Sequence, residues 1–406
     1  MQSNVLFARQ PILDRSQEVF AYELLFRNGT DDHAEFVDGD LATRSVLLSA
    51  FADNSAPQLL NGKPGLLNIR LNMASNLPDF AVEFLYVEIL ETEHNLAILD
   101  HEIEMLTRRG FRVALDDFEM KNYRPELINA VDIVKLDVLA MTREELCFAV
   151  DQLSKHNVLL LAEKVETYEV FHFCESLGFD YFQGYYFCRP ELVTGHVLNA
   201  NRKSLFDLLL LLYKPDDDIA AISQVIKRDA VLSYKLLKLV NSSFYRRATT
   251  VESIEHAVML LGLQRIRSWA TLVCLGELND KPQELQTESF MRATMCEALG
   301  ANISPEMAQK CFSVGMLSSL DAWFDQPLVE LLSRLPLSAE LNNALINREG
   351  ALGVILSTCL NYIHTHWDLL PENGIQSLGL GLTEITKAYE ESIIKTDEMT
   401  LLMREN

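Results

Sequence analysis

The first half of the chain alternates short apolar runs with amphipathic segments. Strands are predicted by apolar-rich runs at 19–25, 66–71, 84–90, 112–116, 133–136, 159–165 and 181–182, with an extra one near Val5. Helices are predicted between them at 40–52, 95–109 and 143–156. Strands that alternate with helices pair in parallel through right-handed crossovers. This half is therefore predicted to be α/β, and the number of strands favours a TIM-like barrel.

The pattern changes to helical period after residue 198. Apolar positions recur at helical spacing through 205–213, 219–245 and 253–275, and strand-like runs disappear. Three aspartates at 216–218 and the Ser304-Pro305 pair are helix-start signals. We therefore predict two domains, a barrel at 1–198 and an all-α domain at 199–406.

Charge and cysteine usage exclude several classes of protein. The 35 Lys and Arg residues against 58 Asp and Glu residues give a net charge of −23, which excludes a broad basic face for DNA or RNA. Seven cysteines without a CxxC pair indicate neither a disulfide framework nor a zinc cluster. The first residues do not have the basic segment followed by a long apolar segment that a signal peptide has. No apolar stretch approaches the roughly 20 residues that a membrane-spanning helix needs. We expect a cytoplasmic protein that neither binds DNA nor inserts into membranes.

Polar residues recur at the ends of the predicted strands. In a parallel barrel the chemistry lies at the C-terminal ends of the strands, where the loops converge. A single acidic residue in a strand is usually a satisfied core or edge group, but a repeated pattern across the barrel indicates a site. The residues in question are Glu23, Asn68, Glu88, Asp116, Asp117, Lys135, Glu163 and Gln183.

Carboxylates converging at a barrel mouth repel one another unless cations lie among them. Oxygen ligands of this kind suit Mg²⁺ or Mn²⁺. Asp116 and Asp117 can both reach one site only where the strand ends, because neighbouring strand residues point to opposite faces. A carboxylate there can bridge two ions, and two-metal sites catalyse in-line phosphoryl displacement. The pattern therefore suggests phosphodiester hydrolysis.

Seven motifs in order resemble the EAL domain, the cyclic-di-GMP phosphodiesterase barrel. They are ARQPILDRSQEVFAYELLFR, LLNIRL, YVEILETE, ALDDF, IVKLD, AEKVE and FQGYYFCRP, and they span about residues 1–198. The resemblance implies a bacterial enzyme that opens cyclic-di-GMP to linear pGpG with two Mg²⁺ or Mn²⁺ ions. Control of motility and biofilm formation is the cellular role that it implies.

The resemblance also assigns roles within the site. Glu23, Asn68, Glu88 and Asp116 match metal ligands, and Asp117 matches a ligand of the second ion. Lys135 and Glu163 are implied to orient or deprotonate the attacking water, with Gln183 supporting the site. The substrate-binding residues implied are Arg27, which contacts a phosphate, together with Gln10, Pro11 and Leu25.

The loop after the two aspartates departs from the family pattern. Active members usually read Asp-Asp-Phe-Gly-Thr-Gly, whereas this chain continues from Phe118 with EMKNYRP at 119–125. Loss of both glycines removes backbone freedom from a loop tied to metal placement and dimer contact in the family. Leu24 replaces the alanine of the name motif, an apolar change that the fold should tolerate. Two main readings remain: hydrolysis, or a degenerate receptor that binds cyclic-di-GMP, or only proteins, and signals through its helical half. A scaffold with an empty barrel is a third.

The helical half resembles the HDOD domain, a relative of the HD metal phosphohydrolases. The resemblance rests on LSYKLLKLVNSSFYRRATTVESIEHAVMLLGLQRIRSWA and on the segment after it. An HD site needs adjacent His and Asp, but no His-Asp dipeptide occurs in the chain, and Ser318 and Ser319 stand where active relatives carry that pair. Serine hydroxyls are poor ligands for a divalent transition metal. We expect a non-catalytic domain for regulation, for homodimer formation or for a protein partner.

Overall fold

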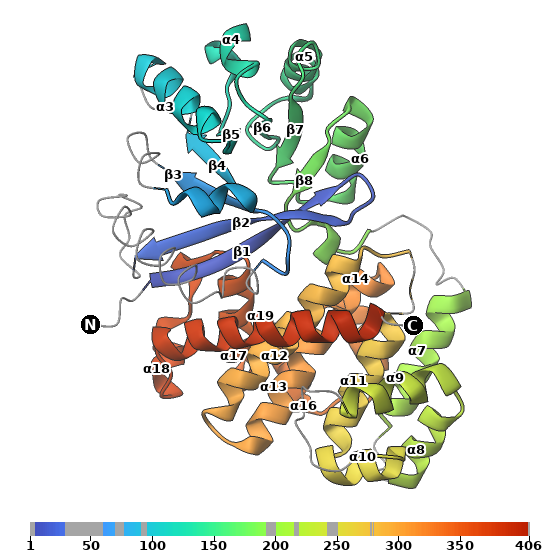
Figure 1. Cartoon of the computed structure of the whole chain (residues 1–406). Coiled ribbons are helices and arrows are strands. Elements are labelled where there is room, and N and C mark those ends of the chain that lie inside the picture. The colour runs from blue at the N-terminus through green and yellow to red at the C-terminus, as the bar shows by residue number, and fades with distance from the viewer. Residues whose placement is uncertain are drawn as a thin grey trace. The chain divides into compact units, whose positions relative to one another are not determined.

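The computed structural model describes residues 5–28, 60–69, 77–90, 96–191, 200–214, 219–241, 251–276, 278 and 280–404. The chain divides into two compact units, Met1–Tyr186 and Phe187–Asn406 (Figure 1). The predicted helix at 40–52 lies outside the described residues. Residues 192–199 do so as well, and the domain boundary after residue 198 stays a prediction.

The first unit is a closed eight-stranded barrel, which confirms the predicted α/β barrel class. Its strands neighbour one another in chain order, and each pair from β2 to β8 is parallel. The strands are β1 (Val5–Asp14), β2 (Val19–Asn28), β3 (Gly65–Ile69), β4 (Leu85–Leu90), β5 (Arg112–Asp116), β6 (Ile133–Asp137), β7 (Leu159–Glu163) and β8 (Tyr181–Gln183).

The first strand runs antiparallel to both of its neighbours, which the expected strict alternation did not predict. Only residues 15–18 separate β1 from β2, too few for the crossover that parallel strands need. The Asp14 carboxylate closes this turn by accepting hydrogen bonds from the backbone N–H groups of Ser16 (2.8 Å) and Glu18 (3.1 Å). The hairpin register then places Gln10 opposite Glu23.

An apolar layer fills the barrel interior. Inward side chains come from successive strands because alternate strand residues share a face. Phe20 and Tyr181 stack beside this layer with ring centroids 3.9 Å apart. The layer consists of Ile12, Ala21, Leu66, Tyr86, Ala114, Ile133 and Leu161.

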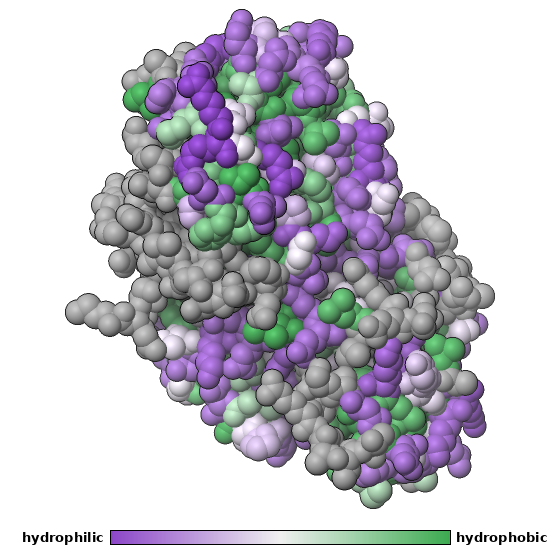
Figure 2. All heavy atoms as spheres, in the orientation of Figure 1, coloured by the Kyte–Doolittle hydropathy of each residue, from purple (hydrophilic) through white to green (hydrophobic). Residues whose placement is uncertain are grey.

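Helices connect the strands around the outside of the barrel (Figure 1). Helix α5 starts with a capping box, in which the Thr142 side chain accepts from the Glu145 N–H and the Glu145 side chain accepts from the Thr142 N–H. On the face seen in Figure 2, mostly hydrophilic side chains cover this helical layer. The helices are η2 (Asp79–Glu83), α3 (Leu96–Arg108), η3 (Met120–Asn122), α4 (Pro125–Ile128), α5 (Arg143–Leu153) and α6 (Tyr168–Leu177).

The described part of the second unit is helical, which confirms the predicted all-α class. Helix α12 lies at its centre and buries residues on nearly every side. Gly315 lets α13 pack closely against α12, because a Cβ at residue 315 would lie 2.7 Å from the Ala293 Cα. No helix in the described ranges is long and apolar enough to cross a membrane.

The elements of this unit are η4 (Tyr186–Cys188), which begins at the last residue of the first unit, α7 (Ala200–Leu212), α8 (Ile219–Lys227), α9 (Ala230–Val240), α10 (Ile254–Leu261), α11 (Leu263–Leu275), α12 (Gln283–Ala301), α13 (Pro305–Leu317), α14 (Leu320–Phe324), α15 (Leu328–Arg334), α16 (Ala339–Asn347), α17 (Gly350–Ile363), η6 (Trp367–Leu369), α18 (Glu372–Ser377) and α19 (Leu382–Arg404).

Candidate functional site

A polar layer lies next to the apolar layer of the barrel. Each polar residue stands two positions from an apolar one on the same strand and therefore points to the same interior. Glu23 follows Ala21, for example, and Asp116 follows Ala114. The layer consists of Gln10, Glu23, Asn68, Glu88, Asp116, Lys135, Glu163 and Gln183. Strand register thus collects side chains that are far apart in the sequence.

Lys135 occupies the middle of this layer, with its side chain fully buried. Its Nζ lies 2.6 Å from Glu88 Oε1, 2.9 Å from Asp116 Oδ1 and 2.6 Å from Glu163 Oε1. Glu23 Oε2 is more distant, at 3.6 Å. One ammonium group therefore links carboxylates from four different strands.

Two amide side chains hold Glu23. Asn68 Nδ2 donates to Glu23 Oε1 at 2.9 Å, and Gln183 Nε2 donates to Glu23 Oε2 at 2.5 Å. The Gln183 amide also donates to Gln10 Oε1 at 3.1 Å. Both Glu23 oxygens are thus oriented by residues from β3 and β8, and the antiparallel β1 joins the same network.

The charges in this layer are not balanced. The carboxylates of Glu23, Glu88, Asp116 and Glu163 face one buried ammonium group, so the cluster carries excess negative charge when all are ionised. Burial and then the charge of Glu23 raise the pKa of Glu88 well above its usual range. Burial also raises the pKa of Glu163 to about 7, against the opposing effect of Lys135.

The pKa of Lys135 also reflects the excess of carboxylate charge in this layer. Burial alone would lower that pKa, but the surrounding carboxylates, Glu23 and Glu88 first, raise it well above its usual value. Lys135 therefore stays protonated, and the cluster still has a deficit of positive charge.

The residues present fit divalent cations that prefer oxygen ligands. Asn68 Oδ1 and Glu88 Oε2 are buried, and no described group donates a hydrogen bond to either. These two residues are register partners on β3 and β4. Unclaimed oxygen acceptors beside excess carboxylate charge are suitable ligands for Mg²⁺ or Mn²⁺.

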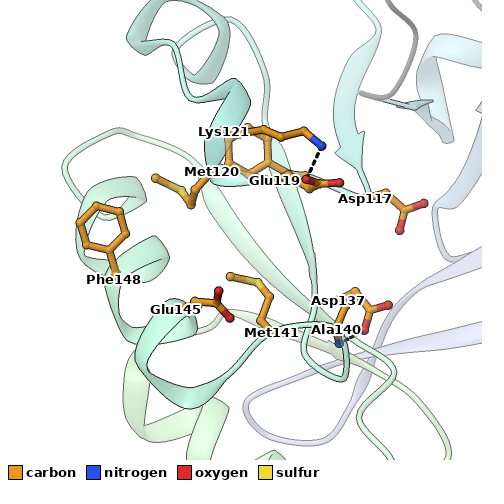
Figure 3. A pocket seen from close by; sticks show the side chains of 10 residues that line it. Asp117, Glu119, Met120, Lys121, Asp137, Ala140, Met141, Glu145 and Phe148 are labelled. Carbon is orange, nitrogen blue, oxygen red and sulfur yellow. Dashed lines mark hydrogen bonds and ion pairs between the residues drawn. The ribbon is translucent and has the colours of Figure 1, made fainter.

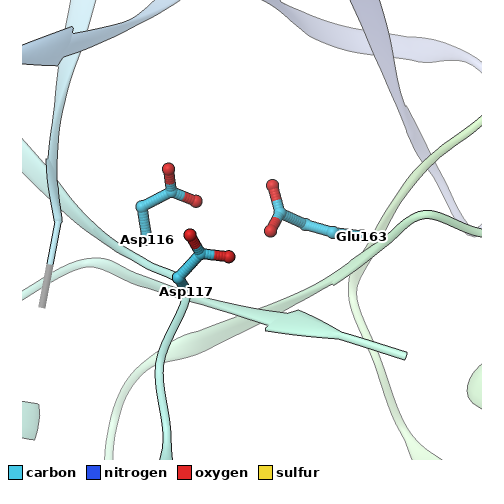
Figure 4. A group of neighbouring side chains, drawn as sticks. All are labelled: Asp116, Asp117 and Glu163. Carbon is cyan, nitrogen blue, oxygen red and sulfur yellow. The ribbon is translucent and has the colours of Figure 1, made fainter. Parts of the chain in front are cut away.

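Asp117 brings another carboxylate to the mouth of the barrel. Strand β5 ends at Asp116, and the next residue has a left-handed backbone with φ of 50°, so the two side chains do not diverge as strand neighbours would. Asp116, Asp117 and Glu163 each offer an oxygen, and these atoms lie within 4.8 Å of one another (Figure 4). Burial and the charge of Asp116 raise the pKa of Asp117. This group could hold a cation at the mouth.

A cavity of about 590 Å³ opens beside Asp117 (Figure 3). Its wall includes the first part of the altered loop, where Lys121 pairs with Glu119 at 2.5 Å. The loop is anchored by side chains, since Arg124 holds the Asp100 carboxylate with two hydrogen bonds of 2.9 Å and the Tyr123 hydroxyl lies 2.7 Å from His156 Nε2. These contacts order a segment that lacks the glycines of the family pattern.

The predicted substrate-binding residues are only partly assembled in the described structure. Gln10 contacts the site through Gln183, while Pro11 is buried in β1 and Leu25 is half-buried in β2. Arg27 belongs to β2, but its side chain lies outside the described residues. Their role in binding a substrate stays a prediction.

Sequence reasoning missed two residues at the barrel mouth. Lys164 has a left-handed backbone with φ of 58°, and its Nζ lies 2.5 Å from Asp137 Oδ2. Gly184 follows Gln183 with φ of 150°, and a Cβ there would lie 2.0 Å from the Val165 carbonyl oxygen. In the sequence, the only indication of a role for Lys164 and Gly184 is that they directly follow Glu163 and Gln183. Their contacts with Asp137 and Val165 are visible only in the folded barrel.

The serines that stand in the HD position are used in packing. Ser318 donates to the Gly315 carbonyl at 2.7 Å, and Ser319 donates to the Met316 carbonyl at 3.1 Å. Ser289 donates to Ser319 at 2.8 Å and accepts from Trp323 Nε1 at 3.1 Å. The expectation that this position is non-catalytic stays a prediction, and these contacts agree with it.

A second buried charge cluster lies within the helical unit. Glu288 of α12 accepts hydrogen bonds from Arg292 Nε (2.8 Å), His364 Nε2 (2.9 Å) and Cys188 Sγ (2.6 Å). Burial alone would raise the pKa of Glu288, but Arg292 and then His364 hold it well below its usual range. Burial lowers the pKa of His364, although Glu288 opposes this effect. The cluster joins segments far apart in the sequence.

The structure defines the class of protein: an α/β barrel with an acidic site at its strand ends, followed in the chain by a helical unit. Comparisons with known proteins identify the family. The EAL domain family model matches residues 68–190, and the HDOD domain family model matches residues 199–324. The chain belongs to the family of two-domain proteins in which an EAL domain precedes an HDOD domain.

Two curated relatives match almost the whole chain. The Uncharacterized protein YuxH of Bacillus subtilis is 33% identical over 400 residues, which cover 96% of this chain and 97% of the relative. The Cyclic di-GMP phosphodiesterase CdgJ of Vibrio cholerae is 30% identical over 392 residues, which cover 95% of this chain and 90% of the relative. Both matches span the two domains.

Among solved structures, a standalone EAL protein from Vibrio cholerae O395 in its c-di-GMP bound form is 23% identical to this chain. The match has a TM-score of 0.37 and covers 46% of this chain and 92% of that one.

Proposed function

We propose that this protein acts in cyclic-di-GMP signalling and that its barrel hydrolyses cyclic-di-GMP to linear pGpG. The observation that carries the proposal is the buried polar layer, in which Lys135 lies among carboxylates from four strands beside unclaimed oxygen acceptors. The Vibrio cholerae relative, whose name describes a cyclic di-GMP phosphodiesterase, supports the same activity. An excess of buried carboxylates is costly unless the site binds cations.

Two Mg²⁺ or Mn²⁺ ions would be held in this layer. Glu23, Asn68, Glu88 and Asp116 would hold one ion, and Asp116 with Asp117 would hold the other. When bound, such ions lower the pKa of a coordinated water and offset negative charge on the leaving oxygen.

The residues of the barrel would activate the attacking water and keep the site in its arrangement. Glu163, beside Asp116 and Asp117 at the mouth, would accept the proton of the attacking water. The water oxygen would form a bond to phosphorus while the bond from phosphorus to the 3′ oxygen breaks. The leaving 3′ oxygen would take up a proton from solvent, which gives a 3′ hydroxyl and a 5′ phosphate. Lys135 stays protonated and keeps the carboxylates in place, and Gln183 fixes the orientation of Glu23.

The substrate itself would be held by residues near the rim of the barrel. Arg27 would contact a phosphate, and Gln10, Pro11 and Leu25 would contact the rest of the nucleotide. The helical unit would regulate the barrel or bind a protein partner, including a second copy of the chain. The Arg27→Ala variant should then weaken binding more than turnover of the bound substrate.

The altered loop favours a second candidate function, binding without turnover. Glu119, Met120 and Lys121 extend from a loop next to Asp117 where the family pattern has small residues. These side chains could prevent the second ion from taking its position. The barrel would then act as a cyclic-di-GMP receptor that signals through the helical unit.

Incubation of the full-length protein with cyclic-di-GMP and Mg²⁺ or Mn²⁺ tests both candidates, with pGpG followed by chromatography. The Glu23→Ala variant is the control, because it removes the carboxylate that both amides hold. Metal-dependent pGpG that disappears in the variant is the expected result. Binding in the presence of Ca²⁺ without product would identify the receptor, and equal turnover in the variant and the parent would contradict the assigned site.

A further inference from the structure

Lys164 is an unusual residue for its backbone conformation. It directly follows Glu163 at the end of β7 and has a φ of 58°, a left-handed conformation that a long side chain adopts only at a cost. Its side chain is about half exposed, and its Nζ lies 2.5 Å from Asp137 Oδ2 on the neighbouring strand. The fold therefore maintains a strained turn that places an ammonium group at the barrel mouth.

Both carboxylate oxygens of Asp137 accept hydrogen bonds. Its Oδ1 accepts hydrogen bonds from the backbone N–H groups of Leu139 (2.9 Å) and Ala140 (3.1 Å), and its Oδ2 faces Lys164. Burial alone would raise the pKa of Asp137, but Lys164 and these N–H groups lower it. Asp137 lines the same cavity as Asp117 (Figure 3), yet its oxygens are already engaged.

The ammonium group of Lys164 also borders the second cation position. Lys164 directly follows Glu163 at the end of β7, and the Asp137 carboxylate that holds its Nζ lines the same cavity as Asp117. Asp117 and Glu163 belong with Asp116 to the group whose ligand oxygens lie within 4.8 Å of one another (Figure 4). A fixed positive charge thus borders the place where a divalent ion would bind.

We propose that Lys164 competes with the second divalent ion at Asp116 and Asp117, beside Glu163. It repels that ion electrostatically, and it keeps Asp137 from becoming a further ligand. The inference rests on the proposed two-metal site and adds that the two ions bind unequally, one tightly and one weakly. The phosphates of a bound substrate would supply the negative charge that recruits the weaker ion.

Manganese binding by metal-free, full-length protein tests this proposal without any substrate. Free Mn²⁺ is counted by electron paramagnetic resonance during a titration of the parent and of Lys164→Gln. We expect one tight and one weak site in the parent, and a weak site about tenfold tighter or more in Lys164→Gln, because a nearby like charge is removed. Lys164→Arg keeps the charge and should bind Mn²⁺ like the parent.

Two further variants separate charge from other effects. Lys155→Gln removes an exposed ammonium paired with Asp151 on α5 and should leave both Mn²⁺ sites unchanged. Lys164→Gly removes the charge and also relieves the left-handed strain, so it should match Lys164→Gln in Mn²⁺ binding while unfolding at a higher temperature.

An unchanged or weakened second site in both Lys164→Gln and Lys164→Gly would overturn the role of Lys164 while leaving the proposed hydrolysis intact. If the parent and every variant bound no Mn²⁺, the two-metal site would itself be wrong, and this inference with it.

Discussion

Lys135 is the residue on which the acidic layer depends. Its Nζ touches carboxylates of three strands within 3 Å, although its own side chain has no contact with solvent. A buried charge among opposite charges contributes little net stability, but its removal leaves the partners uncompensated. The sequence placed this lysine at a strand end, whereas only the closed barrel shows that it lies at the centre.

Replacing Lys135 with methionine should destabilise the barrel strongly in the absence of metal. We expect a loss of about 3–5 kcal/mol in the free energy of unfolding, because the carboxylates around Lys135 lose the buried ammonium group that pairs with them. Millimolar Mn²⁺ should stabilise the variant more than the parent, since the variant has the larger excess of negative charge.

Thermal and urea unfolding with EDTA or with Mn²⁺ measure this effect. Lys155→Met is the matched control and should change stability little, because Lys155 follows the end of α5 and its side chain is exposed. A Lys135→Met variant as stable as the parent in EDTA would show that the carboxylates do not depend on this lysine.

At the scale of elements, the close approach between β8 and the residues after β7 decides how Gln183 is held. The Val165 N–H donates to the Gln183 carbonyl at 2.9 Å, and Gly184 continues the chain with φ of 150°. A side chain at residue 184 has no room, since its Cβ would overlap the Val165 carbonyl. The glycine is thus required by the contact between two segments.

Gly184→Ala should therefore destabilise the barrel by about 3 kcal/mol or more, because the backbone must move to relieve the overlap. Gly62→Ala is the control: residue 62 also has a positive φ, of 68°, but no atom lies within 4 Å of the position that an alanine Cβ would take there. That change should cost only about 1 kcal/mol.

Chemical denaturation of the two alanine variants, with pGpG production measured alongside, makes this comparison. Under the proposed hydrolysis, Gly184→Ala should also lose turnover, since Gln183 would shift away from Glu23. Equal stability of the two variants would mean that the close approach at residue 184 is absent.

Contacts between helices create a pH-sensitive element in the second unit. Glu288 of α12 and His364, at the end of α17, both have folded-state pKa values below their usual ones. Such groups stabilise the folded state above their unfolded pKa values and lose that contribution as the pH falls. Stability should thus decrease below about pH 6.5 through His364 and further below about pH 4.5 through Glu288.

Unfolding measured from pH 8 to pH 3 checks this expectation. His364→Gln can still donate a hydrogen bond to Glu288 but does not titrate, so its stability should change less between pH 7 and pH 5. His172→Gln is the control, because His172 lies on α6 with a side chain 56% exposed. Parallel pH profiles of His364→Gln and the parent would contradict the role given to His364.

At the scale of the whole molecule, the net charge of −23 opposes the approach of an anionic nucleotide. Long-range repulsion lowers the association rate, and dissolved salt screens it over about 30 Å at 0.01 M and about 8 Å at 0.15 M. A positive group of the site such as Lys135 acts only at short range. The charge of the chain and the charge of its site therefore affect different steps of binding.

The association rate of cyclic-di-GMP should accordingly rise severalfold when the ionic strength increases from about 0.01 M to 0.15 M. Stopped-flow binding at constant Ca²⁺ measures it, and the dissociation rate should change much less. A fall in the association rate with salt would indicate that positive charge near the mouth dominates over the charge of the whole chain.

The sequence by itself determined the two-part organisation, the α/β and all-α classes, the polar residues at the strand ends and the family. These features are readable because periodicity, helix signals and ordered motifs are local properties of a chain. The antiparallel β1, the central place of Lys135, the Lys164–Asp137 pair and the Glu288 cluster were decided by the tertiary structure. They depend on strand register, barrel closure and helix packing, which bring together residues that no local pattern connects.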